Sequence, residues 1–124
     1  MSISRLMATG AALTVVVLLG AFVGIAVTIG SGVRDASAAA VAEYGGDRVD
    51  ALIAVVESPA QSLTERNRAV WALGQLGEAR ALPVLERHFT GGPCDHTRLI
   101  CQHELEKAIR LCRGSKNVSA FIWR

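Results

Sequence analysis

The sequence predicts an all-α fold in which an N-terminal transmembrane helix precedes a short α–α superhelix of two helical hairpins. Residues 6–33 are apolar and contain no charged side chain, and a helix needs only about 20 such residues to span a bilayer. Residues 68–76 and 82–89 then repeat apolar side chains at the spacing that lines one face of a helix. Gly77 and Pro83 separate these stretches and suit the end of one helix and the first turn of the next.

The composition limits the classes of function. With 124 residues, the chain has room for one domain at most. Its 13 Lys and Arg residues nearly balance its 11 Asp and Glu residues, and the net charge is +2. This balance gives no electrostatic case for a nucleic-acid partner. The three cysteines allow at most one intramolecular disulfide and leave one free thiol.

After a short tail, residues 1–5, the apolar segment 6–33 has two interpretations. It is a membrane anchor or a cleavable signal peptide, because residues 36–38 and 38–40 offer the small-x-small pattern that a signal peptidase accepts. The apolar part of a signal peptide has about 7–15 residues, so the longer segment favours an uncleaved single-pass anchor in the membrane. The short tail and the signal-like layout favour an N-terminus inside the cytoplasm and a C-terminal domain outside it.

Gly20 and Gly24 form a GxxxG pattern within this segment. Small residues four apart let two membrane helices approach closely, so one interpretation is a homodimer through the transmembrane helix. The alternative is that these glycines have no partner, because glycine is common in membrane helices.

Residues 34–46 are assigned to a linker, whose alanines can prolong the membrane helix to Tyr44 before Gly45 and Gly46 break it. Asp47 can cap the next helix, which ends at Ser58 and Pro59. The apolar face of that helix is formed by Val49, Leu52, Ile53 and Val56.

Ser62 and Glu65 form a capping box that starts the helix containing Trp71. The helix after Pro83 is followed by a glycine-rich loop around residues 91–93. A last helix is expected over residues 98–113, with Gly114 after its end.

The stretch 66–89 resembles a HEAT repeat of the phycobilisome-lyase type, here in a membrane-anchored protein of bacterial type. The residues that match the family pattern are Arg68, Ala69, Ala72, Leu73, Gly74, Leu76, Gly77, Arg80, Ala81, Leu82, Pro83 and Leu85, and Glu78 replaces the usual Asp. The resemblance implies two HEAT-like repeats over residues 47–114. A C-terminal capping tail, residues 115–124, is expected to pack over the open end of the last repeat.

Cys94, His96, Cys101 and His103 have the residue types of a zinc site. Helix geometry opposes such a site, because residues 101 and 103 point to opposite sides of the last helix. No metal site is therefore predicted. Cys94 can fold back to reach Cys101, whereas Cys112 lies too far along the helix from Cys101. The alternatives are a Cys94–Cys101 disulfide outside the cytoplasm or free thiols within it.

No catalytic motif is present in the sequence, so we expect a non-enzyme without a cofactor. The family resemblance implies a membrane-anchored scaffold for protein–protein interaction or assembly with an unidentified protein partner. Trp71, Phe121 and Trp123 are candidate partner contacts, and packing inside the fold is the alternative for each. The alternative functions are an accessory subunit of a lyase-like enzyme that handles a chromophore or cofactor, and a Cys/His redox or metal sensor.

Overall fold

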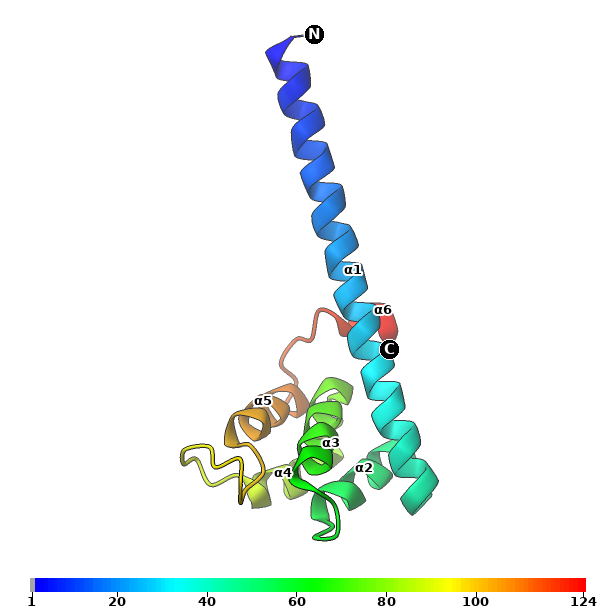
Figure 1. The fold of residues 1–124 in the computed structure, drawn as a ribbon, viewed down its shortest axis with the longest axis vertical. Helices are drawn as coiled ribbons and strands as arrows, with labels where there is room; N and C mark the ends of the chain where they lie inside the picture. The colour runs from blue at the N-terminus through cyan, green and yellow to red at the C-terminus, as the bar shows by residue number, and fades with distance from the viewer. Residues whose placement is uncertain (1) are drawn as a thin grey trace.

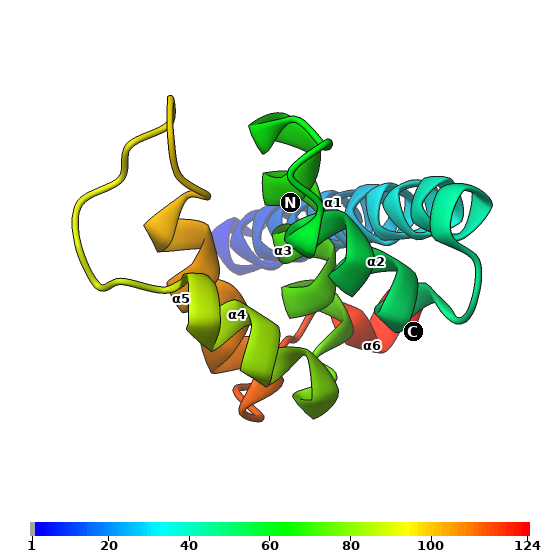
Figure 2. The same ribbon diagram turned by 90° about the horizontal axis from the view of Figure 1, so that it is seen from below.

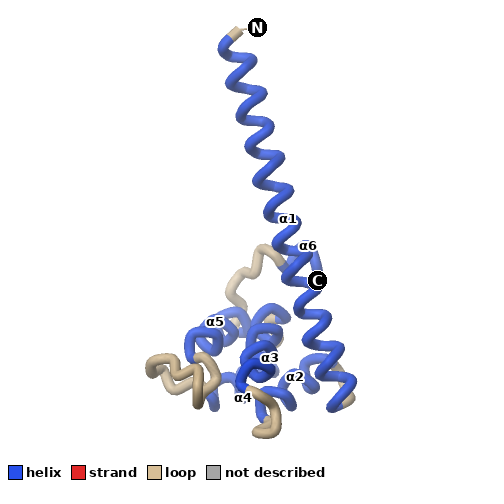
Figure 3. Tube along the Cα trace, in the orientation of Figure 1, coloured by secondary structure: helices blue, strands red, loops and turns tan. Residues whose placement is uncertain are grey.

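The computed structural model describes residues 2–124, and this part of the chain forms helices without strands. The all-α prediction is confirmed. A long helix projects from a bundle of shorter ones (Figure 1), and the tube in Figure 3 shows the loops that join them. The elements are α1 (Ile3–Tyr44), α2 (Arg48–Glu57), α3 (Leu63–Leu76), the 3-10 turn η1 (Ala79–Ala81), α4 (Leu82–His88), α5 (Gln102–Cys112) and α6 (Ala120–Trp123).

Helix α1 has an exposed half and a packed half. Every residue from Ser2 to Ile25 is exposed, whereas the side facing the bundle is buried from Ala26 onward. The buried positions recur every three or four residues and are mostly small, which lets α2 and α3 approach closely. They are Ala26, Gly30, Val33, Ala36, Ser37 and Ala40.

The sequence analysis assigned residues 34–46 to a linker but allowed its alanines to prolong the membrane helix to Tyr44, and the structure has this longer helix. Residues 34–44, assigned to a linker, continue α1 and contribute Ala36 and Ala40 to the core. Their alanines favour helix, and no Gly or Pro interrupts them before Gly45. Gly45 and Gly46 then end the helix with φ of 72° and 75°, a conformation that glycine adopts without steric cost.

The predicted caps of α2 and α3 are present. The carboxylate of Asp47 accepts hydrogen bonds from the backbone N–H groups of Val49 and Asp50 at 2.7 and 3.3 Å. The hydroxyl of Ser62 accepts the N–H of Glu65 at 3.2 Å. Both contacts satisfy amides that the first turn of a helix leaves without an internal partner.

Helix α3 is the centre of the bundle. It packs against α1, α2 and α5, while α4 contacts both α5 and α2 (Figure 2). A Cβ on Gly74 would lie 2.8 Å from the Cα of Ala108, so only glycine allows α3 and α5 to meet this closely. Gly77 ends α3 with φ 67°, and Pro83 lies in the first turn of α4, as predicted.

Arg80, one of the residues that match the repeat pattern, has a structural role. Its guanidinium pairs with both carboxylate oxygens of Asp47 at 2.7 and 2.8 Å, and with Asp50 at 3.2 Å. The side chain thus joins the turn after α3 to the first turn of α2. Because all three side chains are partly exposed, the pairing fixes geometry more than it adds stability.

The C-terminal tail lies elsewhere than predicted. Helix α6 packs against α1 beside the base of its exposed half (Figure 1), not over the open end of the last repeat. A Cβ on Gly30 would come within 2.4 Å of the Cβ of Trp123, so the glycine provides the notch that the tail occupies. The outer side of α5 needs no apolar cover, because it carries the exposed polar side chains His103, Glu106, Arg110 and Arg113.

The end of the tail also caps α3. The guanidinium of Arg124 donates to the carbonyl oxygens of Gln75 and Leu76 at 2.7 and 2.6 Å. These carbonyls belong to the last turn of α3, which lacks internal donors. The tail is therefore part of the domain, although Phe121 within it is 89% exposed.

Candidate functional site

The exposed half of α1 is the candidate membrane segment. Among residues 2–124, α1 is the helix that is long and apolar enough to cross a bilayer, with a mean hydropathy of 2.6 over its most apolar window. Gly20 and Gly24 lie within it, and a Cβ built on either would meet nothing within 4 Å. Their side of the helix is therefore accessible to a second helix, and the homodimer stays a prediction.

Trp71 marks a second surface, formed by α3 between α1 and α5. The indole is half-buried, and its Cη2 atom would lie 3.1 Å from a Cβ on Gly32 of α1. On its other side lie Glu104 and Lys107 of α5, which form an ion pair at 2.8 Å. Trp71 is thus held inside the fold along one edge and accessible along the other.

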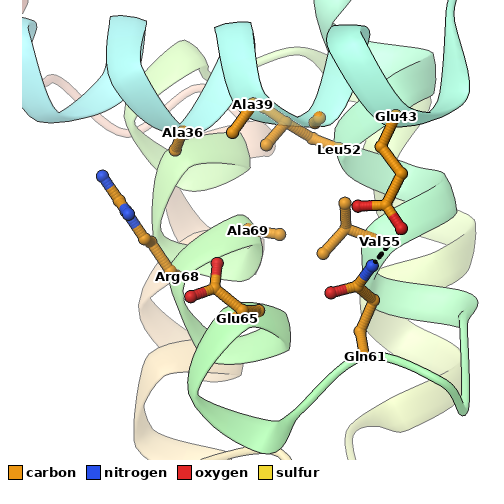
Figure 4. Close-up of a pocket in the computed structure, with 10 residues that line it drawn as sticks. Ala36, Ala39, Glu43, Leu52, Val55, Gln61, Glu65, Arg68 and Ala69 are labelled. Atoms are coloured by element: carbon orange, nitrogen blue, oxygen red, sulfur yellow. Dashed lines mark hydrogen bonds between the residues drawn. The ribbon is translucent and has the colours of Figure 1, made fainter.

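Next to this surface is a small cavity between α1, α2 and α3 (Figure 4). Its volume is about 40 Å³, and alanines of α1 form its wall. At its rim, the side-chain amide of Gln61 donates to Glu43 at 2.7 Å and to the hydroxyl of Tyr44 at 3.1 Å. Sites for cofactor-sized ligands occupy about 300–1,000 Å³, so this cavity suits a few waters and not a chromophore.

The loop between α4 and α5 brings two cysteines together. The Sγ atoms of Cys94 and Cys101 lie 3.3 Å apart as free thiols. Cys101 is the residue immediately before α5, and Cys94 lies over the first turn of that helix. The backbone N–H of His103, the thiol of Cys101 and the N–H of Gln102 lower the pKa of Cys94, with desolvation opposing them. The predicted approach of this pair is present, and the disulfide itself stays a prediction.

Gln102 holds both ends of this loop. Its side chain is 3% exposed, and its oxygen accepts the backbone N–H and the hydroxyl of Thr90 at 2.7 and 3.1 Å. Its NH₂ group donates to the carbonyls of His88 and Ile100 at 3.2 and 3.0 Å. The side-chain oxygen of Asn67 on α3 accepts the N–H of Cys101 at 2.8 Å. The loop therefore leaves and re-enters the bundle at fixed points.

His96 lies beside the two cysteines, as one of the four residues that the sequence analysis considered for a zinc site. The ligand atoms of Cys94, His96 and Cys101 all lie within 4.8 Å of one another. The helical argument against Cys101 and His103 sharing an ion still applies, but His96 precedes the helix and reaches the cysteines from the loop. The loop thus brings three candidate ligands together, and the prediction of no metal site stays a prediction.

Cys112 has a different environment. It is buried in the core, and its thiol donates to the carbonyl of Leu73 at 3.5 Å. Burial raises the pKa of this thiol to about 11, so it stays protonated at neutral pH. Cys112 is therefore a small core residue.

His88 is also partly withdrawn from water. Burial, followed by the nearby charges of Arg66 and Arg87, lowers the pKa of its imidazole. Among the described residues, His96 is the histidine that joins the cysteine cluster.

The comparisons with known proteins concern α3 and α4. Residues 65–90 match the family described as the PBS lyase HEAT-like repeat. No curated protein matches the chain, and no solved structure matches it. The match supports the predicted resemblance to a HEAT-like repeat over the segment from α3 to the end of α4.

Proposed function

We propose that the chain is a non-catalytic HEAT-repeat scaffold, anchored by a single uncleaved membrane span, that holds a protein-binding surface on the extracytoplasmic side. The observation that carries this proposal is the continuity of α1. One helix contributes exposed apolar surface over residues 3–25 and core residues from Ala26 to Val41. A domain attached in this way keeps a fixed orientation to the bilayer, which suits an assembly platform.

Core packing favours an anchor over a cleaved signal peptide. Cleavage after Ala38 would remove Val33 and Ala36, which are 1% and 7% exposed in the core. It would also remove Gly30 and Gly32, against which Trp123 and Trp71 pack. Truncating one buried aliphatic side chain costs about 2–5 kcal/mol, so a mature domain beginning at residue 39 would lose much of its stability.

The position of the C-terminal tail on α1 agrees with a membrane span that ends near Ile25. A span of about 20 residues from Leu6 ends near Ile25, one to two turns before the α6 contact at Gly30. Trp123 and the exposed Phe121 then lie close to the interfacial zone, where aromatic side chains are enriched.

Two stacked helical hairpins, α2–α3 and α4–α5, agree with a short HEAT-like superhelix. α1 covers the first hairpin, and the polar outer side of α5 closes the second, so the array needs no further repeat for solubility. The surface along α3 with Trp71, Arg68 and Gln75 is the proposed partner-binding surface, because a partly exposed tryptophan among charged groups is typical of interaction sites.

The anchor is tested on the full chain expressed with a C-terminal reporter. We expect resistance to alkaline extraction from membranes, an intact mass that includes residues 1–38, and a reporter that is active only outside the cytoplasm. A mature N-terminus near Ala39 would contradict the anchor, and activity of the reporter inside would contradict the orientation.

The partner surface is tested by photo-crosslinking in cells. A photoreactive residue at Arg68 or Gln75 is expected to capture a protein, whereas one at Arg110 or Glu106 on the outer side of α5 is the matched control. Capture from the α5 positions but not from the α3 positions would show that the scaffold uses another surface. Absence of capture at all four positions would contradict a protein-binding role for the domain.

A further inference from the structure

The loop between α4 and α5 contains a set of side chains that the scaffold proposal does not use. The exposed Cys94 and His96 both fold back over the N-terminal end of α5, where Cys101 lies. An exposed loop of this length has many conformations in which these three side chains diverge. Their convergence, on a loop fastened by the buried Gln102, requires a chemical explanation.

We infer that Cys94, His96 and Cys101 form a binding site for one Zn²⁺ ion or a closely similar soft divalent cation. Two thiolates and one imidazole are the donor set that zinc prefers. A tetrahedral ion would use these three ligands and leave its fourth position to water. The proposal does not rest on the scaffold function, and it requires both thiols in their reduced form.

The spacing of the ligand atoms agrees with a shared ion. Two sulfurs bound to one tetrahedral zinc at about 2.3 Å each would lie about 3.8 Å apart. The two Sγ atoms lie 3.3 Å apart, so they must separate by only a few tenths of an ångström. The farthest pair of ligand atoms in the set lies within 4.8 Å, a gap that rotation of the exposed His96 side chain can close.

The surroundings of the cluster supply the supporting interactions that metal sites need. Asn67 fixes the backbone of Cys101 through its N–H at 2.8 Å. Asp95, between the two loop ligands, accepts the backbone N–H and hydroxyl of Thr97 at 3.0 and 2.6 Å and shapes the turn.

Metal binding and a disulfide between Cys94 and Cys101 exclude each other, because each uses both sulfurs. The site is therefore available only to the reduced protein. A bound ion would fasten the tip of the loop to α5 and thereby order the surface beside Phe89 and Glu106.

The test uses the full chain in detergent, reduced with a phosphine and freed of metal by a chelator. Co²⁺ is the probe, because thiolate ligation gives it a near-ultraviolet charge-transfer band and tetrahedral geometry gives intense visible bands. We expect one Co²⁺ per chain with both signatures, and displacement by one equivalent of Zn²⁺. Binding without the thiolate band, or absence of binding, would overturn the proposal.

Variants identify the ligands. Cys94→Ser and Cys101→Ser are each expected to abolish or halve the charge-transfer band, and His96→Ala to weaken binding by at least about 10–100-fold, the loss typical of a single disturbed contact at a metal site. His103→Ala and Cys112→Ser are the matched controls and should bind as the parent does. Equal weakening by His103→Ala and His96→Ala, or a full band in either cysteine variant, would contradict the assignment. Circular dichroism of each variant verifies that its helices are intact.

Discussion

The contact between the tail and α1 can be tested by adding one methyl group. Gly30→Ala places a Cβ 2.4 Å from the Cβ of Trp123 and 2.7 Å from its Cγ, both close to the backbone of α6. Atoms so near the main chain cannot rotate away, so α6 must move off α1. In an exposed helix the same substitution would stabilise by about 1 kcal/mol.

The magnitude follows from what the displaced tail loses. Complete burial of a tryptophan is worth about 3–5 kcal/mol against alanine. Trp123 is only partly buried, and its buried indole N–H has no hydrogen-bond partner among the described residues. We therefore assign the Trp123 contact about 2 kcal/mol. The higher helix propensity of alanine offsets about 1 kcal/mol of this loss, so we expect Gly30→Ala to destabilise the domain by a net of about 1 kcal/mol.

The decisive comparison uses a chain that ends at Asn117. Deleting residues 118–124 should cost about 3 kcal/mol, because Trp123 and the buried Ala120 are lost together with the Arg124 cap. In that shortened chain Gly30→Ala meets no tail and should stabilise the domain. Gly30→Ala should therefore lower the free energy of unfolding in the full chain and raise it in the shortened chain.

Urea unfolding of the full chain in detergent micelles, followed by far-ultraviolet circular dichroism, measures these differences. Phe121→Ala is the control within the tail: its side chain is 89% exposed, so we expect a change within about 0.5 kcal/mol. If Gly30→Ala stabilises both chains equally, the tail does not occupy the glycine notch. If the deletion leaves the unfolding midpoint unchanged, α6 is free and its apolar side chains are available for a partner.

Three further predictions concern other parts of the molecule. The hydrogen bonds from Arg80 and from the α2 amides lower the pKa of Asp47 from 3.8 to about 2. The contribution of Asp47 to stability is therefore present above pH 4 and is lost as the pH falls towards 2. Asp47→Asn should weaken the dependence of the unfolding midpoint on pH in this range more than Asp50→Asn does. Replacing Gly20 and Gly24 by leucine should abolish cross-linking between two tagged copies in membranes, and unchanged cross-linking would assign any dimer to another surface. In metal-free protein isolated without reductant, only Cys112 should be alkylated after unfolding; equal labelling of all three thiols would exclude the Cys94–Cys101 disulfide.

Local signals predicted most of the helices correctly because each end is specified by a few neighbouring residues. Asp47, Ser62 and Gly77 have cap geometries that the structure reproduces. The core stripe of α3 was also predictable, since Ala69, Leu73 and their neighbours follow the helical period. The positions of α1 and α6 were not, because they depend on contacts between residues far apart in the sequence, such as Gly30 with Trp123.

The candidate metal ligands were also beyond local sequence signals. A helical wheel correctly separates Cys101 from His103, but it cannot describe residues 91–100, which have no repeating geometry. Gln102 fixes the two ends of the loop that carries His96, through four hydrogen bonds to Thr90, His88 and Ile100. Gln102 is the first residue of α5, and its burial is what indicates that its side chain bonds to the loop. That burial cannot be read from the sequence.

The glycines of α1 carry the most information about how the two parts of the chain work together. Gly20 and Gly24 meet nothing in the described structure, whereas Gly30 and Gly32 accept tryptophans from α6 and α3. All four glycines lie in one long stretch of apolar and small residues, so the sequence alone does not distinguish them. The difference arises because the domain folds back on the last turns before Tyr44 and leaves the earlier turns exposed. If the earlier turns lie in the bilayer, any rotation or tilt of the membrane helix must turn Gly30 and Gly32 with it, and through the two tryptophans it must turn α3 and the tail as well. A partner bound along α3 would therefore sense the state of the membrane helix directly, and no flexible linker would weaken that coupling.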